Sequence, residues 1–294
     1  MGAHPGPGKV IAHRADPDGA PFYTATADGA GTFLFRVHGH FDFEVSAGLD
    51  ELRLFWDPAE EPAGAGVYVT GTVMAFLRTL AGFLTLHGSA VRAHGADRPA
   101  ISFLGPSGAG KTTVAALALA SGYGVLSDDV LCIDPSGGPA RMLRGSDELR
   151  IRPEAAWALD AFPPDASVTT RVTSDGRVAV RARDGDGGAG DVPVHGVERE
   201  DPSVRLAALV IPVPDRTCRA VQVERLSAAD ALLAVASQPR LTGWIDRTIL
   251  ARQFAAIGDL VADVPVVRAR LPWMPADAGR GVAALLDDVL AHAP

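Results

Sequence analysis

The stretch Pro99-Ala-Ile-Ser-Phe-Leu-Gly-Pro-Ser-Gly-Ala-Gly-Lys-Thr112 decides the fold class of this chain. Its first six residues predict a short buried strand, and the run Thr113–Ala120 predicts a helix that Gly122 ends. Between them, residues 105–112 fit the pattern G-x-x-x-x-G-K-[ST], in which backbone N–H groups and a lysine bind the phosphates of a nucleotide. The order of strand, loop and helix therefore predicts an α/β fold that contains a P-loop.

Lysine is rare in this sequence. Of 27 lysines and arginines, only Lys9 and Lys111 are lysines. An ammonium group is a compact point charge on a slim stem, whereas a guanidinium group is a broad planar fork. We therefore interpret Lys111 as the group that fits beneath a loop wrapped around phosphates; a glycine-rich turn before an ordinary helix is the alternative. The predicted nucleotide-binding residues are Gly105, Pro106, Ser107, Gly108, Ala109, Gly110, Lys111, Thr112 and Thr113.

Two adjacent carboxylates follow the loop, and the expected ligands are ATP and Mg²⁺. Asp128 and Asp129 end an apolar strand that starts at Tyr123. A P-loop needs a carboxylate at the end of a neighbouring strand to organise Mg²⁺. We expect one of the two carboxylates to hold the metal together with the Thr112 hydroxyl, and the other to accept the proton of an attacking hydroxyl. The alternative is a solvated Asp-Asp turn.

Histidines give one further candidate. His87 lies at the end of an apolar segment and precedes Gly88 and Ser89. Beside two carboxylates it could share a proton with one of them, although a lone histidine at a strand end is more often structural. We interpret His38-x-His40 as a surface pair and not as a metal site.

Composition excludes several classes of partner. The net charge is −8 and the isoelectric point about 5.4, so no electrostatic footprint for nucleic acid is present. Two distant cysteines, Cys132 and Cys218, indicate a reducing cytoplasm and no zinc site. The apolar segment Val67–Leu86 contains Arg78 at its centre, which disfavours a membrane span and favours a buried helix over Gly71–Gly82.

The chain divides into two predicted regions. Residues 1–66 should form a loose tail over residues 1–20, a small antiparallel β element over Phe22–Trp56 and a linker over Pro58–Gly66. Residues 67–294 should form the P-loop domain with a mixed sheet. We expect a polar flexible loop over Asp184–Asp191. Other predicted elements are strands at 32–37, 41–45, 52–56, 83–91, 123–134, 149–153, 206–213, 220–224 and 264–271. One helix is predicted to begin at Glu154, a second to begin at Ala228 with Ser227 as its N-cap, and a third to span 276–291.

Three segments together resemble one known family. The segments His87–Val91, Gly105–Thr112 and Leu126–Asp129 resemble HPr kinase/phosphorylase and its relatives, in which a histidine strand precedes the P-loop and an Asp-Asp strand follows it. The resemblance covers residues 84–133 well. It is closest to the HPr-kinase-like proteins associated with lasso-peptide biosynthesis, which phosphorylate a serine hydroxyl on a peptide.

The resemblance implies an ATP-dependent kinase with a peptide or protein substrate and a possible homo-oligomer. It assigns four catalytic roles: Asp129 accepts the proton of the substrate hydroxyl, Asp128 assists at the metal, His87 assists Asp129, and Lys111 contacts the β- and γ-phosphates. It suggests Glu148 as a third metal-site residue, and Arg216 or Arg219 as the arginine that completes the site. The C-terminal segment typical of the bifunctional enzymes is not recognisable, so the resemblance implies neither phosphorylase activity nor HPr as the substrate. A kinase for a small alcohol such as free serine or a sugar, and a nucleotide-gated regulatory ATPase, are the alternatives.

Overall fold

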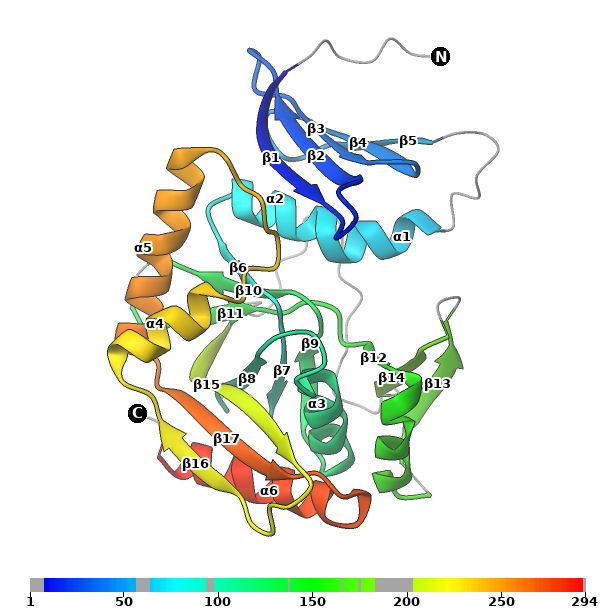
Figure 1. Cartoon of the computed structure of the whole chain (residues 1–294), viewed down its shortest axis with the longest axis vertical. Helices are drawn as coiled ribbons and strands as arrows, with labels where there is room; N and C mark the ends of the chain where they lie inside the picture. Colours follow the sequence, from blue (N-terminus) through cyan, green and yellow to red (C-terminus); the bar gives the residue numbers. More distant parts are fainter. Residues whose placement is uncertain are drawn as a thin grey trace. The chain divides into compact units, whose positions relative to one another are not determined.

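The computed structural model describes residues 8–56, 64–93, 98–136, 138–164, 166–173, 176–182 and 203–292. The chain forms two compact units (Figure 1). Unit 1 contains residues 1–85 and 240–256, and unit 2 contains residues 86–239 and 257–294. Strand β6 (Leu84–Leu86) and helix α5 (Arg247–Asp263) each contribute residues to both units. Unit 1 therefore extends past the predicted 1–66 region and takes residues from far along the sequence.

Unit 1 is built on a five-stranded antiparallel sheet with strand order β1-β2-β3-β4-β5. The strands are β1 (Lys9–Ala15), β2 (Pro21–Ala27), β3 (Phe33–Val37), β4 (Phe41–Val45) and β5 (Leu52–Trp56). Alternation along β3 and β4 buries every second side chain, as expected for a sheet covered on one face. The prediction of three strands here is confirmed. The prediction that residues 1–20 are loose is wrong for β1, because Ile11 and Ala12 are buried in the core.

A helical segment covers the buried face of this sheet (Figure 1). It runs through α1 (Ala65–Tyr68), a π-helical stretch (Val69–Val73) and α2 (Met74–Leu80). Phe76 on α2 packs against Phe35 of β3, with ring centroids 5.0 Å apart. The helix predicted over Gly71–Gly82 therefore begins earlier, and Ala65 and Gly66 of the predicted linker are helical; residues 57–63 lie outside the described part of the chain.

The distant segment of unit 1 completes its core. Leu241 is buried among the sheet residues, and Trp244 stacks on Phe76 with centroids 5.6 Å apart. Backbone bonds join this segment to β1: the His13 N–H donates to the Gly243 carbonyl at 2.8 Å, and the Ile245 N–H donates to the Ile11 carbonyl at 2.8 Å.

Unit 2 contains a mixed sheet in which the order β10-β11-β15-β8-β7-β9 can be followed. Strand β17 runs parallel to β15, and β16 pairs antiparallel with β17. Strands β8 and β15 are parallel, whereas β7 is antiparallel to both β8 and β9. The strands are β7 (Gly88–Arg92), β8 (Ala100–Leu104), β9 (Gly124–Ser127), β10 (Leu131–Asp134), β11 (Arg141–Leu143), β15 (Ser203–Asp215), β16 (Gln222–Arg225) and β17 (Val266–Pro272).

Two helices pack in the main core of unit 2. Helix α3 (Lys111–Ala120) lies against α6 (Pro275–Ala291), and both bury their apolar residues against the strands. Helix α4 (Ala228–Ala236) begins at Ser227, whose hydroxyl accepts a hydrogen bond from the Asp230 N–H, as the sequence predicts. The predicted helix at Glu154 is instead a 3₁₀ helix, Pro153–Ala161.

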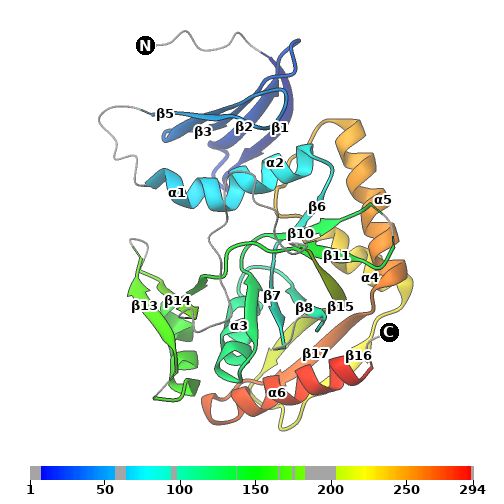
Figure 2. The ribbon, with the colours of Figure 1, turned by 180° about the vertical axis from the view of Figure 1, so that it is seen from behind.

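A small separate sheet of order β12-β14-β13 lies beside α3 (Figure 2). Its strands are β12 (Leu149–Ile151), β13 (Val168–Val172) and β14 (Val178–Ala182), and the last two were not predicted. The predicted loop Asp184–Asp191 lies outside the described residues. Among the described residues, no helix combines the length and apolar character needed to cross a membrane.

Candidate functional site

The strand directions of unit 2 bring the predicted site residues to one edge of the sheet. Strand β8 ends at Leu104, directly before the glycine loop, by which we mean residues 105–110. Because β7 is antiparallel to both β8 and β9, the start of β7 and the end of β9 lie at the edge where β8 ends. His87 precedes β7, and Asp128 follows β9. His87 and Asp128 are far apart in the sequence but lie at the same edge of the sheet.

Glycine gives the loop its backbone conformation. Gly105, Gly108 and Gly110 have φ angles of 147°, 87° and 85°, which L-residues rarely adopt. Gly110 is the N-cap of α3, and a Cβ there would lie 2.8 Å from the Trp273 ring. The loop thus leads tightly into the helix, whose first-turn N–H groups at residues 111–113 have no acceptor within the helix. Such a turn is a favourable place for an anion.

Lys111 folds back over the loop. Its Nζ donates hydrogen bonds to the carbonyl oxygens of Gly105 at 2.7 Å and Pro106 at 2.9 Å, so two of its three donors hold the first limb of the loop. The residue is 6% exposed. Burial lowers the pKa of Lys111 to about 8, although the charges of Asp128 and Asp129 act in the opposite direction. A phosphate group would favour the ammonium form.

Asp128 is a buried carboxylate with three hydrogen-bond donors around it. Oδ1 accepts from the Ser89 hydroxyl at 2.6 Å and the Thr112 hydroxyl at 3.1 Å, and Oδ2 accepts from the Arg150 N–H at 3.2 Å. Burial raises the pKa of Asp128 above its usual value, with a smaller contribution from the charge of Asp129, and the hydrogen bonds oppose this shift. The contact between Asp128 and Thr112 joins the carboxylate to the helix that follows the glycine loop.

Asp129 occupies the centre of a tight turn. Its φ angle is 71°, and the Val130 N–H donates to the Asp128 carbonyl at 2.9 Å, which closes a three-residue γ-turn. A positive φ at a γ-turn is strained for a residue with a side chain. The continuous strand predicted over 123–134 is therefore broken between β9 and β10. The turn leaves the Asp129 side chain 47% exposed, whereas Asp128 is buried.

His87 lies beside this turn and separates β6 from β7, so the single strand predicted over 83–91 is interrupted. Its Nδ1 is 3.2 Å from the Asp129 carboxylate oxygen Oδ1 and 3.2 Å from the Asp129 carbonyl oxygen. Both oxygens only accept hydrogen bonds, so these contacts assign the proton to Nδ1. The backbone N–H of His87 donates to the Gln238 carbonyl at 2.9 Å. His87 is thereby positioned to orient Asp129.

The other predicted site residues are placed differently. The Glu148 carboxylate accepts hydrogen bonds from the Arg171 guanidinium at 2.7 and 3.0 Å, so its contacts are with β13. Arg216 and Arg219 are exposed in the turn after β15. Sequence reasoning missed Arg152, which follows β12 and donates from Nη2 to the Ser107 hydroxyl of the glycine loop at 2.6 Å. That contact depends on the tertiary pairing of β12, which no local sequence pattern indicates.

The donors at this edge are suitable for Mg²⁺. Thr112 and Asp128 supply a hydroxyl and a carboxylate oxygen in mutual contact, and Mg²⁺ prefers hard oxygen ligands, with one or two carboxylates completed by water and phosphate. Among the described residues, no cluster of three or more His, Cys, Asp or Glu side chains could bind a metal by itself. Thr112 and Asp128 therefore fit a metal that is shared with a phosphate ligand.

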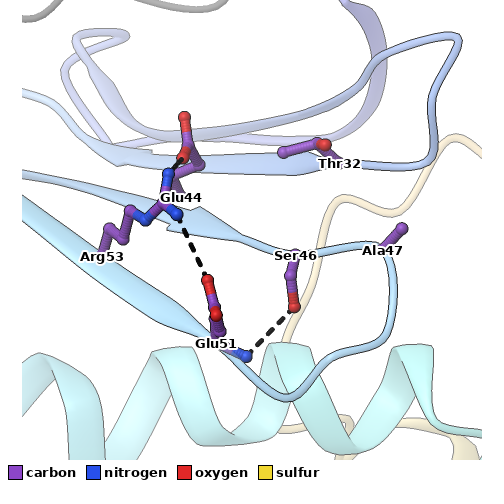
Figure 3. Close-up of a pocket in the computed structure, with 6 residues that line it drawn as sticks. All are labelled: Thr32, Glu44, Ser46, Ala47, Glu51 and Arg53. Atoms are coloured by element: carbon purple, nitrogen blue, oxygen red, sulfur yellow. Dashed lines mark hydrogen bonds and ion pairs between the residues drawn. The ribbon is translucent and has the colours of Figure 1, made fainter.

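Unit 1 contains a surface pocket of a different kind (Figure 3). Arg53 donates to the Glu44 carboxylate at 3.3 Å and to the Glu51 carboxylate at 3.2 Å, and the Ser46 hydroxyl accepts from the Glu51 N–H at 3.0 Å. Its charged groups thus pair with one another. The lining residues are Thr32, Glu44, Ser46, Ala47, Glu51 and Arg53.

Comparison of the chain with protein-family models and with curated proteins gave no match.

Proposed function

We propose that this protein is an ATP-dependent phosphotransferase that moves the γ-phosphoryl group to a serine-type hydroxyl of a peptide or protein, with a precursor peptide of the lasso-peptide type as the favoured class of acceptor. One observation carries the proposal: the edge that holds the glycine loop and Lys111 also holds a buried carboxylate on the Thr112 hydroxyl and an exposed carboxylate on His87. Phosphoryl transfer needs a phosphate-binding loop, a cation and nearby carboxylates, because its catalysis consists mainly of positioning the reactants and stabilising charge in the transition state.

The phosphate-binding part is the glycine loop with the first turn of α3. Backbone N–H groups of residues 107–113 would bind the phosphates, and the Lys111 ammonium would neutralise charge between the β- and γ-phosphates. Thr112 and Asp128 would hold Mg²⁺, which supplies charge neutralisation on the phosphate oxygens when bound. Burial raises the pKa of Asp128, and a bound cation would oppose this shift because it favours the ionised carboxylate.

The acceptor part is the Asp129 turn. In the transfer, a bond forms between the acceptor oxygen and the γ-phosphorus while the bond from the γ-phosphorus to the bridging oxygen breaks, and its electron pair leaves with ADP. The hydroxyl proton passes to the Asp129 carboxylate. Asp129 suits this role because its carboxylate is 47% exposed and a substrate can reach it. His87 would hold the carboxylate in place through its Nδ1–H group.

Two other functions use the same nucleotide site. A kinase for free serine or a sugar differs only in the acceptor, and a regulatory ATPase transfers the phosphoryl group to water. Product analysis separates all three: the protein is incubated with Mg²⁺ and labelled ATP, with candidate peptides or with small alcohols. Label on a peptide serine supports the proposal, label on a small alcohol supports the metabolite kinase, and free phosphate alone supports the ATPase.

Asp129→Asn tests the proposed base. Asparagine tolerates a positive φ nearly as well as aspartate, so the turn and the folded state should persist. We expect kcat to fall by about 10²- to 10⁴-fold with little change in ATP affinity. Transfer at the wild-type rate would show that another group accepts the proton.

A further inference from the structure

Arg152 contacts the glycine loop from a part of the chain that is not adjacent in sequence. It follows β12, and Pro153 behind it starts the 3₁₀ helix, so its backbone is fixed in an extended conformation with φ −72° and ψ 152°. Its Nη2 donates to the Ser107 hydroxyl at 2.6 Å, and its Nη1 is 3.8 Å from the Glu154 carboxylate. The side chain remains 43% exposed. The guanidinium is thus held at the loop by two surface contacts.

Arg152 and Lys111 converge on the same limb of the loop. Lys111 binds the carbonyl groups of Gly105 and Pro106, and Arg152 binds the next residue, Ser107. Lys111 and Arg152 carry like charges that repel each other, so an anion bound at this limb would stabilise both side chains.

The opposite limb has the metal donors. Thr112 lies in the first turn of α3, at the other end of the glycine loop from Ser107, and its hydroxyl contacts Asp128. A lysine of this motif reaches the outer two phosphates of a nucleotide. The anionic group nearest both Lys111 and Arg152 is therefore the outermost phosphate and not the inner ones, which the helix N-terminus holds.

We propose that Arg152 is a phosphate-binding residue for the terminal phosphoryl group of the nucleoside triphosphate, and that Ser107 holds its guanidinium at the loop until that group binds. The inference rests on the proposed function and adds a ligand-binding residue to it. The guanidinium fork can donate two parallel hydrogen bonds to phosphate oxygens, which an ammonium cannot. As the phosphoryl group leaves ADP, the same fork stabilises the charge on its oxygens.

The test compares Arg152→Gln with Arg181→Gln. Arg181 belongs to the same small sheet, is 45% exposed and pairs with Asp147 at 3.1 Å, so its variant removes an equally exposed arginine away from the loop. Affinities for ADP and for a non-hydrolysable ATP analogue are measured with Mg²⁺, together with kcat. We expect Arg152→Gln to weaken binding of the analogue about tenfold or more, to leave ADP binding nearly unchanged, and to lower kcat by about a thousandfold.

Further variants identify the guanidinium itself. Arg152→Lys should recover only part of kcat because it restores the charge without the fork, and added guanidinium ion should partly restore kcat of Arg152→Ala. Equal loss of ADP and analogue binding, or wild-type values for both and for kcat, would overturn the inference while the proposed function stands. A wild-type protein that binds neither nucleotide would overturn both.

Discussion

The two units of this protein handle charge in opposite ways. In unit 1, charged side chains pair across the sheet: Arg36 makes two hydrogen bonds of 2.8 Å to Asp42. Apart from Thr79 and Thr85, the buried side chains described there are apolar or aromatic. In unit 2, the ammonium of Lys111 and the carboxylate of Asp128 are buried, and both have pKa values shifted by burial. Buried charges oppose folding unless a partner compensates them. Their concentration at one edge of unit 2 is what distinguishes a ligand site from a structural unit.

Backbone conformation shows the same contrast. The non-glycine residues of positive φ in the described chain are Leu49 and Asp129. Leu49 lies in a turn between two strands of unit 1, whereas Asp129 lies in the γ-turn at the candidate site. A strained backbone persists only where the surrounding structure holds it. Around Asp129 that structure includes His87 and the buried carboxylate of Asp128.

The largest expected effect comes from Lys111→Met. Loss of the ammonium removes the cation from the phosphate site and should lower kcat/KM for ATP at least a thousandfold, about 4 kcal/mol of transition-state stabilisation. Steady-state kinetics with labelled ATP measure the change. Lys9→Met is the matched control, since Lys9 is the other lysine of the chain and is exposed on β1. Similar losses of kcat/KM in Lys111→Met and Lys9→Met would contradict the assignment of the phosphate site to unit 2.

A smaller effect is expected from Phe35→Ala in unit 1. Phe35 is fully buried and contacts the rings of Tyr23 and Phe76, both with centroids 5.0 Å away. Truncation should lower the free energy of unfolding by about 3 kcal/mol through lost packing. Urea denaturation measures it, with Phe55→Ala, 38% exposed, as the control expected to lose less than about 1 kcal/mol. A loss at Phe55 as large as at Phe35 would contradict the placement of the unit 1 core.

The smallest effect is a pH dependence of nucleotide binding. Lys111 has a lowered pKa of about 8, and a bound phosphate would favour its protonated form. Affinity should therefore be constant below about pH 8 and fall by up to about tenfold per pH unit above it, as binding becomes coupled to proton uptake. Calorimetric titration with a fully ionised nucleotide at constant ionic strength measures this slope. An affinity that stays level or rises above pH 8 would show that Lys111 does not meet the phosphates.

Much of the fold could be predicted because local patterns specify it. Alternation predicted strands β3 and β4, and the Ser227 cap predicted α4. Unit 1 as a whole could not be predicted, since Leu241 and Trp244 join its core through contacts that span about two hundred residues of sequence. Helix α5 was not predicted either, because exposed apolar residues such as Phe254 and Leu250 blur its amphipathic pattern.

The candidate site follows a similar division. The glycine loop could be read from residue types, because positive φ at Gly108 and Gly110 requires glycine. The proximity of His87 to Asp129 depends on the antiparallel pairing of β7, which no local pattern encodes. Arg152 had no signal among the 27 basic residues, and no local pattern indicated that Glu148 forms an ion pair with Arg171.

The most direct test of the account is a crystal structure of the protein with Mg²⁺ and a non-hydrolysable ATP analogue at saturating concentration. Phosphates should be hydrogen-bonded to backbone N–H groups of residues 107–113, with the Lys111 ammonium on their outer oxygens and the metal on the Thr112 hydroxyl beside Asp128. A nucleotide bound elsewhere, or a glycine loop that holds no phosphate under these conditions, would contradict the account.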